Sequence, residues 1–216
     1  MSRKRTAIFI SGRGSNMVAL LEAASAASFP AEVAMVFSNV PEAPGLAKAE
    51  EAGIATKAMD HKAFAGRAEF EAEIQKELDA ASIQLICLAG FMRLLTDPFV
   101  SAWHNRMINI HPSLLPAYKG LDTHRRVIRD GGRMHGCTVH YVRPQMDQGP
   151  IIAQAAVPVH ADDTDETLAA RVLSAEHQLY PMALEMVANG TVRVAGEKVR
   201  FEGKDKDQPA LLSPAL

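Results

Sequence analysis

Residues 107–116 read Met-Ile-Asn-Ile-His-Pro-Ser-Leu-Leu-Pro, a short apolar strand that breaks into a loop between two prolines. Side chains alternate between the faces of a strand, so Asn109 and His111 point to one face while Ile108 and Ile110 pack behind them. An amide donor beside a group that can carry a proton suits a developing oxyanion, as in acyl transfer. This segment therefore predicts a buried strand that presents a polar pair at its end.

Short apolar runs alternate with amphipathic stretches on both sides of this strand. The alternation predicts the α/β fold class, with a mostly parallel sheet that helices cover on both faces. We expect strands at 7–10, 32–37, 54–58, 84–88, 107–111 and 138–142, with an antiparallel edge strand at 151–159. Helices are expected from about residue 16, from Pro44 to near Gly53, over 70–81, 123–129 and 165–188, before a hairpin at 191–201.

Length and composition favour one soluble domain in a reducing compartment. The 216 residues carry a net charge of -2, which gives no electrostatic case for nucleic acid, and no apolar run is long enough to span a membrane. The two cysteines do not form a disulfide framework, so we expect a cytoplasmic protein. The predicted domain is 1–201, and 202–216 is predicted to be a flexible tail.

A glycine-rich turn, Ser11-Gly12-Arg13-Gly14-Ser15-Asn16, connects the first strand to the first helix. Its backbone amides and the helix N-terminus can bind an anion. Met17 occupies the third glycine position of a dinucleotide fingerprint, and the second strand ends without an acidic residue for a ribose. We therefore expect a single phosphate there, the alternative being a tight turn without a ligand.

Two carboxylates stand out in the second half of the chain. Asp147 lies in a turn after a strand, where it could orient His111 and favour its charged form, although an ordinary turn aspartate is the alternative. Glu176 follows Val172 by four residues along an apolar helix stripe, so its carboxylate needs a buried base or a bound cation as partner. His177 is expected on the solvated side of that helix.

The remaining candidates are a histidine pair and an apolar loop. His135 and His140 flank Cys137 but point to opposite faces of one strand, so we expect no metal site. The loop over 88–95 leaves a buried strand and would line a crevice at the carboxyl end of the sheet, with plain core packing as the alternative.

Taken together, these motifs resemble those of the glycinamide ribonucleotide formyltransferases, folate-dependent enzymes of purine synthesis. The resemblance runs nearly end to end. It covers Ser-Gly-x-Gly-Ser-Asn at 11–16, Phe-Ser-Asn at 37–39, Leu-Ala-Gly-Phe-Met-Arg at 88–93, Asn-Ile-His-Pro-Ser-Leu-Leu-Pro at 109–116, His-Gly-Cys-Thr-Val-His at 135–140, Asp-x-Gly-Pro at 147–150 and Glu-His-x-x-Tyr-Pro at 176–181. Several formyltransferases share the central motif, whereas the N-terminal loop is typical of the glycinamide ribonucleotide branch. Arg13 and Lys119 stand where some relatives have Asn and Pro.

The resemblance implies a single-domain formyltransferase fold with a Rossmann-like sheet and a C-terminal antiparallel portion. The N-terminal half would bind the phosphate and the C-terminal half the folate. It implies 10-formyltetrahydrofolate as formyl donor, no metal, small-molecule substrates, no nucleic acid or membrane partner, and a monomer or homodimer. The implied catalytic residues are Asn109, His111 and Asp147. The implied ribonucleotide contacts are Gly14, Ser15, Asn16, Met17 and Glu176. The implied folate contacts are Arg67, Met92, Arg93, Leu94, Leu95, Asn109, Arg143, Pro144, Gln145, Met146 and Asp147.

Two other functions remain open from the sequence. A formyltetrahydrofolate hydrolase would use the same three catalytic residues with water as acceptor, and would have no need of the loop at 11–17. A non-catalytic nucleotide- or folate-binding protein would not require Asn109, His111 and Asp147 together.

Overall fold

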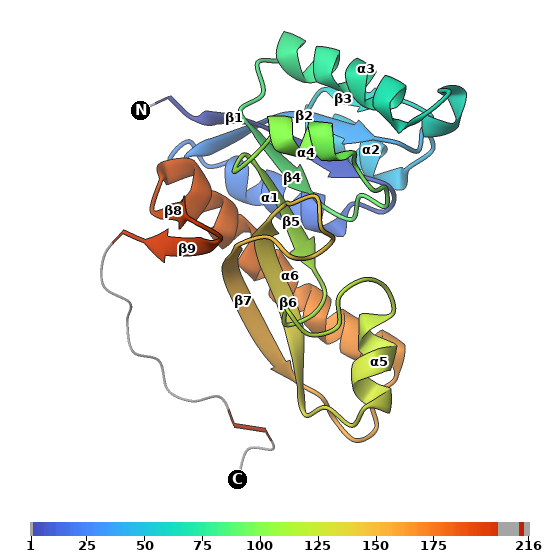
Figure 1. The fold of residues 1–216 in the computed structure, drawn as a ribbon, viewed down its shortest axis with the longest axis vertical. Helices are drawn as coiled ribbons and strands as arrows, with labels where there is room; N and C mark the ends of the chain where they lie inside the picture. The colour runs from blue at the N-terminus through green and yellow to red at the C-terminus, as the bar shows by residue number, and fades with distance from the viewer. Residues whose placement is uncertain (1, 203–211, 214–216) are drawn as a thin grey trace. The chain divides into compact units, whose positions relative to one another are not determined.

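The computed structural model describes residues 2–202 and 212–213 (Figure 1). Its elements in chain order are β1 (Lys4–Ile10), α1 (Ser15–Ala24), β2 (Ala31–Ser38), α2 (Pro44–Glu51), β3 (Thr56–Ala58), a 3₁₀ turn (His61–Ala63), α3 (Arg67–Ala80), β4 (Leu85–Leu88), α4 (Asp97–Ala102), β5 (Met107–His111), α5 (Thr123–Arg129), β6 (Met134–Tyr141), β7 (Ile151–Pro158), α6 (Asp165–Asn189), β8 (Val192–Ala195) and β9 (Lys198–Phe201).

The strands confirm the predicted α/β class. Over the described residues a seven-stranded sheet has the order β3-β2-β1-β4-β5-β6-β7, and β8 and β9 form a separate two-stranded sheet. Neighbouring strands from β3 to β5 run parallel, whereas β7 is antiparallel to β6 and β9 to β8. The antiparallel portion is therefore C-terminal, as predicted.

The chain forms two compact units. Unit 1 comprises the described residues up to Asn109 together with Tyr141–Pro144, and unit 2 comprises Ile110–His140 and the described residues from Gln145 onwards. The prediction of one domain over 1–201 stays a prediction. Most of the predicted tail, at 203–211 and 214–216, lies outside the described residues.

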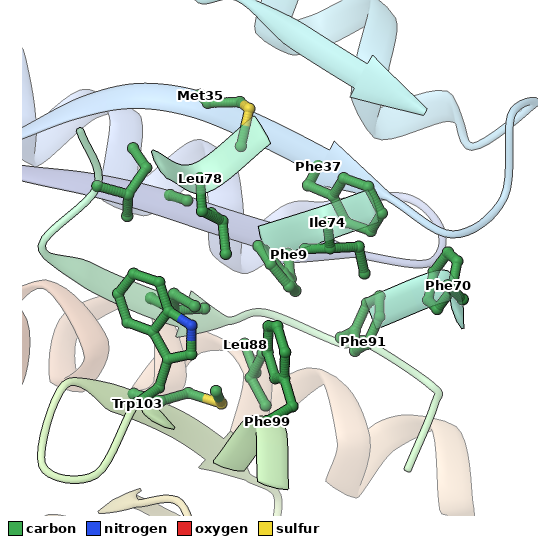
Figure 2. Packing of buried hydrophobic residues seen from close by; sticks show 14 residues of the cluster. Phe9, Met35, Phe37, Phe70, Ile74, Leu78, Leu88, Phe91, Phe99 and Trp103 are labelled. Atoms are coloured by element: carbon green, nitrogen blue, oxygen red, sulfur yellow. The ribbon is translucent and has the colours of Figure 1, made fainter. Parts of the chain in front are cut away.

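An aromatic cluster that includes Phe9, Phe37, Phe70 and Phe91 fills one face of the sheet in unit 1 (Figure 2). The ring centroid of Phe9 lies 4.9 Å from that of Phe37 and 5.3 Å from that of Phe91. Helix α3 adds Ile74 and Leu78, both fully buried, and each such side chain stabilises the fold by about 1.5–3 kcal/mol. The spacing of these residues along the helix is what predicted α3 from the sequence.

Helices α1 and α2 cover the opposite face of the same strands. Ile8 and Ile10 alternate with Phe9 along β1, so they face away from the aromatic cluster and are fully buried on the other side. Met17 and Leu20 of α1 are fully buried as well. Unit 1 therefore has helices on both faces of its sheet, as the sequence predicted.

In unit 2, the long helix α6 packs against β7. Thr164 caps its N-terminus through a reciprocal pair of hydrogen bonds with Thr167, and Gly190 ends it in the left-handed conformation at φ 80°. Both ends agree with the prediction to within a residue, although Pro181 lies inside the helix. No helix among residues 2–202 is long and apolar enough to cross a membrane.

Candidate functional site

In unit 1, the glycine-rich turn becomes the N-terminus of α1. Gly14 takes a left-handed conformation at φ 68° immediately before the helix, and no side chain caps that end. The first backbone N–H groups of a helix have no partner within it, and the helix dipole makes this end positive. The arrangement can bind an anion through the amides that follow Gly14.

Gly45 holds this turn in place, and sequence reasoning missed it. Its N–H donates to the carbonyl oxygen of Gly12 at 3.0 Å, so the start of α2 lies against the turn. A Cβ on Gly45 would lie 2.5 Å from Cδ1 of Ile10 and 2.9 Å from the Gly12 oxygen. Only glycine fits there without displacement. The Pro-Gly pair at the start of a predicted helix was the available signal.

The loop after β4 is the second feature of unit 1. Its backbone turns at Gly90, with φ 77°, whose carbonyl accepts from the N–H of Ser11 at 3.1 Å. Met92 and Leu94 are each 64% exposed, while Leu95 packs against the aromatic cluster. The loop therefore presents apolar side chains to solvent, which plain core packing would not do.

Three predicted folate contacts in unit 1 are arginines. The Arg67 guanidinium lies 3.5 Å from the carbonyl oxygen of Leu94, so it stands beside the exposed loop. Arg143 donates to the side-chain oxygen of Asn105 at 2.8 Å, which fixes its guanidinium. Arg93 of the loop is half-buried. The structure thus brings Arg67 to the predicted loop residues.

In unit 2, His111 and Asp147 form a pair. His111 Nδ1 lies 3.6 Å from Asp147 Oδ2, and the two side chains are 8% and 9% exposed. His111 Nε2 lies 3.0 Å from the carbonyl oxygen of Tyr118. A carbonyl only accepts, so the Nε2 atom carries a proton, and a second proton on Nδ1 creates an imidazolium facing the carboxylate.

Other groups hold Asp147 in place. The N–H of Gly120 donates to Asp147 Oδ2 at 2.9 Å, and His140 Nε2 lies 3.9 Å from Asp147 Oδ1. Asp147 itself adopts a left-handed backbone at φ 54°. A cavity of about 140 Å³ lies beside its carboxylate, large enough for water, and Lys119 is among its lining residues.

The loop after β5 is anchored by Thr138 of β6, which sequence reasoning did not single out. The Thr138 hydroxyl donates to the Ser113 carbonyl oxygen at 2.7 Å and accepts from the N–H of Leu115 at 3.0 Å. Gln154 of β7 donates to both the Thr138 hydroxyl and the Leu115 carbonyl oxygen at 2.9 Å. These contacts fix the loop that follows His111.

Two more histidines lie in the same unit. His135 Nε2 is 3.2 Å from Nδ1 of His124. Burial lowers the pKa of His135 to about 4, and the nearby His124 and His111 add to the shift. The pKa of His124 is also lowered by burial. Both rings therefore stay neutral at pH 7. In the described part of the chain, no three His, Cys, Asp or Glu side chains gather as a metal site would need.

Helix α6 places Glu176 in the interior of unit 2. Its side chain is 6% exposed, as the apolar stripe suggested. Burial, reinforced by the charge of Glu176, raises the pKa of the Cys137 thiol to about 12. The prediction for His177 is wrong, because its ring is half-buried with a covered Nε2 atom. The buried surface of α6 is therefore wider than the apolar stripe that the sequence indicated, and it extends to His177.

Asn109 lies in β5 two residues before His111 and is half-buried. Strand alternation directs both side chains to the same face of β5. In unit 1 the candidate groups are the turn at 14–17, the loop at 90–95 and Asn109 of β5. In unit 2 they are His111, Asp147 and Glu176.

Comparisons with known proteins identify the family. The model of the formyl transferase family matches residues 4–184. Over 197 residues the chain is 41% identical to phosphoribosylglycinamide formyltransferase of Escherichia coli, covering 91% of this chain and 93% of that protein. The crystal structure of phosphoribosylglycinamide formyltransferase from Brucella melitensis matches at 55% identity and a TM-score of 0.84, covering 90% of this chain and 100% of the other.

The chain also matches part of much longer proteins. It is 47% identical over 193 residues, 89% of its length, to the trifunctional purine biosynthetic protein adenosine-3 of Gallus gallus, but spans only 19% of that protein. The matched span of the family model and the near-complete coverage of the bacterial relatives lead to one conclusion. The chain belongs to the formyl transferase family.

Proposed function

We propose that this chain is a phosphoribosylglycinamide formyltransferase of de novo purine biosynthesis. It transfers the formyl group of 10-formyltetrahydrofolate to the amine of N1-(5-phospho-D-ribosyl)glycinamide, giving the formylated ribonucleotide and tetrahydrofolate. The observation that carries this proposal is the buried His111–Asp147 pair, at 3.6 Å, in a chain whose bacterial relatives of nearly equal length bear that enzyme name.

The ribonucleotide phosphate binds the N-terminus of α1. The amides of Gly14, Ser15, Asn16 and Met17 surround it, because no side chain caps this end of the helix and Gly45 keeps the turn close to α2. Glu176 receives the ribose and glycinamide portion, whose hydroxyl and amine donors suit a buried carboxylate.

The folate binds the exposed apolar loop and the segment that carries Asp147. Its pterin contacts Met92, Arg93, Leu94 and Leu95, and the exposure of Met92 and Leu94 supports this assignment. Arg67 meets the glutamate tail, since its guanidinium stands at the edge of that loop. The remaining folate contacts are Asn109, Arg143, Pro144, Gln145, Met146 and Asp147.

In the reaction, the lone pair of the glycinamide amine attacks the formyl carbon on N10. The carbonyl π electrons move to oxygen, and the Asn109 amide and the positive charge of protonated His111 stabilise that oxyanion. Collapse re-forms the carbonyl and breaks the bond to N10, which takes up the proton that the amine loses. Asp147 keeps His111 charged, and water in the neighbouring cavity carries the proton. Holding both substrates together removes much of the barrier.

The proposal extends to the setting of the enzyme. Its partners are the two small-molecule substrates, with neither nucleic acid nor a membrane involved. It acts in the cytoplasm as a monomer or homodimer, which sedimentation of the purified chain distinguishes.

The change in folate absorbance tests the proposed reaction. The protein is mixed with 10-formyltetrahydrofolate, with and without the ribonucleotide, alongside His111→Ala. A signal that requires the ribonucleotide and is lost in His111→Ala supports the transferase. A signal without the ribonucleotide indicates a hydrolase, and silence in both arms indicates a binding protein, so either result overturns the proposal.

A further inference from the structure

The hydroxyl of Ser11 connects three segments of unit 1 that are distant in the sequence. Ser11 directly follows β1 and opens the glycine-rich turn. Its Oγ accepts from the N–H of Met92 at 2.7 Å and donates to the side-chain oxygen of Asn39 at 2.5 Å. The hydroxyl has one donor and a limited acceptor capacity, and these two contacts employ both kinds.

The Asn39 side chain is itself held from the other side. Asn39 is 3% exposed and follows β2, and its Nδ2 lies 3.2 Å from His61 Nδ1. His61 Nδ1 also lies 3.1 Å from the Asn39 carbonyl oxygen, and its ring packs edge-on against Phe70. The direction of the Ser11 hydroxyl is therefore set by a chain of partly buried polar contacts that ends at Phe70 of the aromatic cluster.

The contact with Met92 reaches the loop assigned to the folate. The hydrogen bond from Ser11 N–H to the Gly90 carbonyl fixes the loop after β4 at Gly90. The Ser11 hydroxyl fixes the same loop two residues later, at Met92. Met92 is 64% exposed and makes few packing contacts of its own, so hydrogen bonds decide where its backbone lies.

We propose that Ser11 is a positioning residue for the folate, whose hydroxyl, oriented by Asn39, holds the exposed loop at Met92 in its binding conformation. This inference rests on the proposed function. Loss of the hydroxyl loosens the loop without removing any group that contacts reacting atoms. The effect therefore falls on the KM for the folate and not on kcat.

The test compares Ser11→Ala, Asn39→Ala and the double variant with Ser25→Ala as control, because the Ser25 hydroxyl contacts only its own helix end among the residues described. We expect the folate KM to rise roughly tenfold in Ser11→Ala and roughly threefold in Asn39→Ala. In the double variant the folate KM rises no further than in Ser11→Ala, because Asn39 acts on the loop only by orienting the Ser11 hydroxyl. The ribonucleotide KM and kcat stay within about twofold to threefold of wild type, as do all values for Ser25→Ala.

Binding of tetrahydrofolate, measured by calorimetry with melting temperatures beside it, separates this role from a structural one. The Kd follows the folate KM if Ser11 positions the loop. An unchanged folate KM and Kd in Ser11→Ala, a fall in kcat alone, or effects that multiply in the double variant overturn the inference. If Asn39→Ala does not fold, His61→Phe replaces it, since this change removes the ring nitrogen that contacts the Asn39 side-chain amide and backbone carbonyl. Failure of wild type to transfer formyl rejects the proposed function, while the Kd comparison still tests Ser11.

Discussion

Replacing Asp147 by Asn removes one charge from the candidate catalytic pair and little else. The Asn side-chain oxygen can still accept from the N–H of Gly120, so the local backbone keeps its contact. What disappears is the attraction between a carboxylate and protonated His111, whose nearest atoms lie 3.6 Å apart. We therefore expect a folded protein that has lost this attraction.

The distance sets the size of the loss. With both side chains less than a tenth exposed, an effective dielectric constant of about 20 gives an attraction of about 4–5 kcal/mol at this separation. Because 1.36 kcal/mol corresponds to a factor of ten in rate, the full attraction corresponds to a factor of about 1000 to 5000. Solvent screening offsets part of it, so kcat should fall by a factor of about 100 to 1000.

Steady-state formyl transfer measures this loss, with both substrates varied in turn. The KM for each substrate should stay within about threefold of wild type, since the main proposed role of Asp147 is to stabilise protonated His111. Asp130→Asn is the control, because Asp130 pairs with Arg129 on the surface. A kcat within tenfold of wild type in Asp147→Asn would refute the reasoning, as would an equal fall in Asp130→Asn.

Three further predictions concern the glycine-rich turn and the buried ring of His135. Gly45→Ala should destabilise the fold by about 1–3 kcal/mol in urea unfolding and raise the ribonucleotide KM, because the new Cβ would lie 2.5 Å from Ile10 Cδ1; an unchanged KM contradicts this. Arg13→Asn should raise the ribonucleotide KM severalfold at low salt and less at high salt, with an unchanged folate KM, because Arg13 adds an exposed cation to the turn; a salt-independent effect contradicts it. The pKa of His135 falls from 6.5 to about 4 on folding, so the unfolded chain binds a proton first as the pH drops below 6.5. The free energy of unfolding therefore falls by up to about 3 kcal/mol between pH 6.5 and 4. His135→Asn should weaken that dependence in urea titrations at pH 5 and 7.5, and parallel curves for the two proteins would rule it out.

Much of the fold could be predicted because local patterns and tertiary packing agree. Strand β5 and helix α5 have the predicted bounds, and α6 ends at its predicted glycine. The strand expected at 138–142 begins at Met134 instead. A Cβ on Gly136 would lie 1.9 Å from the Ala155 carbonyl oxygen, so glycine is what lets β7 pair so closely with this earlier part of the strand.

Helix α4 was missed because a six-residue helix is too short to show periodicity. Local patterns singled out His111 and the turn at 11–16, where chemistry and local structure coincide, and their roles stay predictions. Contacts that join distant segments could not be predicted. Thr138 anchors the loop after β5 from 25 residues away, and Asn39 meets Ser11 across 28 residues. Such partners have no local signature, because the topology of the sheet alone brings them together.

The fate of the formyl carbon is the most direct test of the central claim. The protein is incubated with 10-formyltetrahydrofolate labelled with carbon-13 in the formyl group and with the glycinamide ribonucleotide, and the products are separated by mass spectrometry. The account predicts that the label appears in the ribonucleotide in an amount equal to the tetrahydrofolate formed. Label recovered as formate, or a ribonucleotide that stays unlabelled while the folate is consumed, would contradict it.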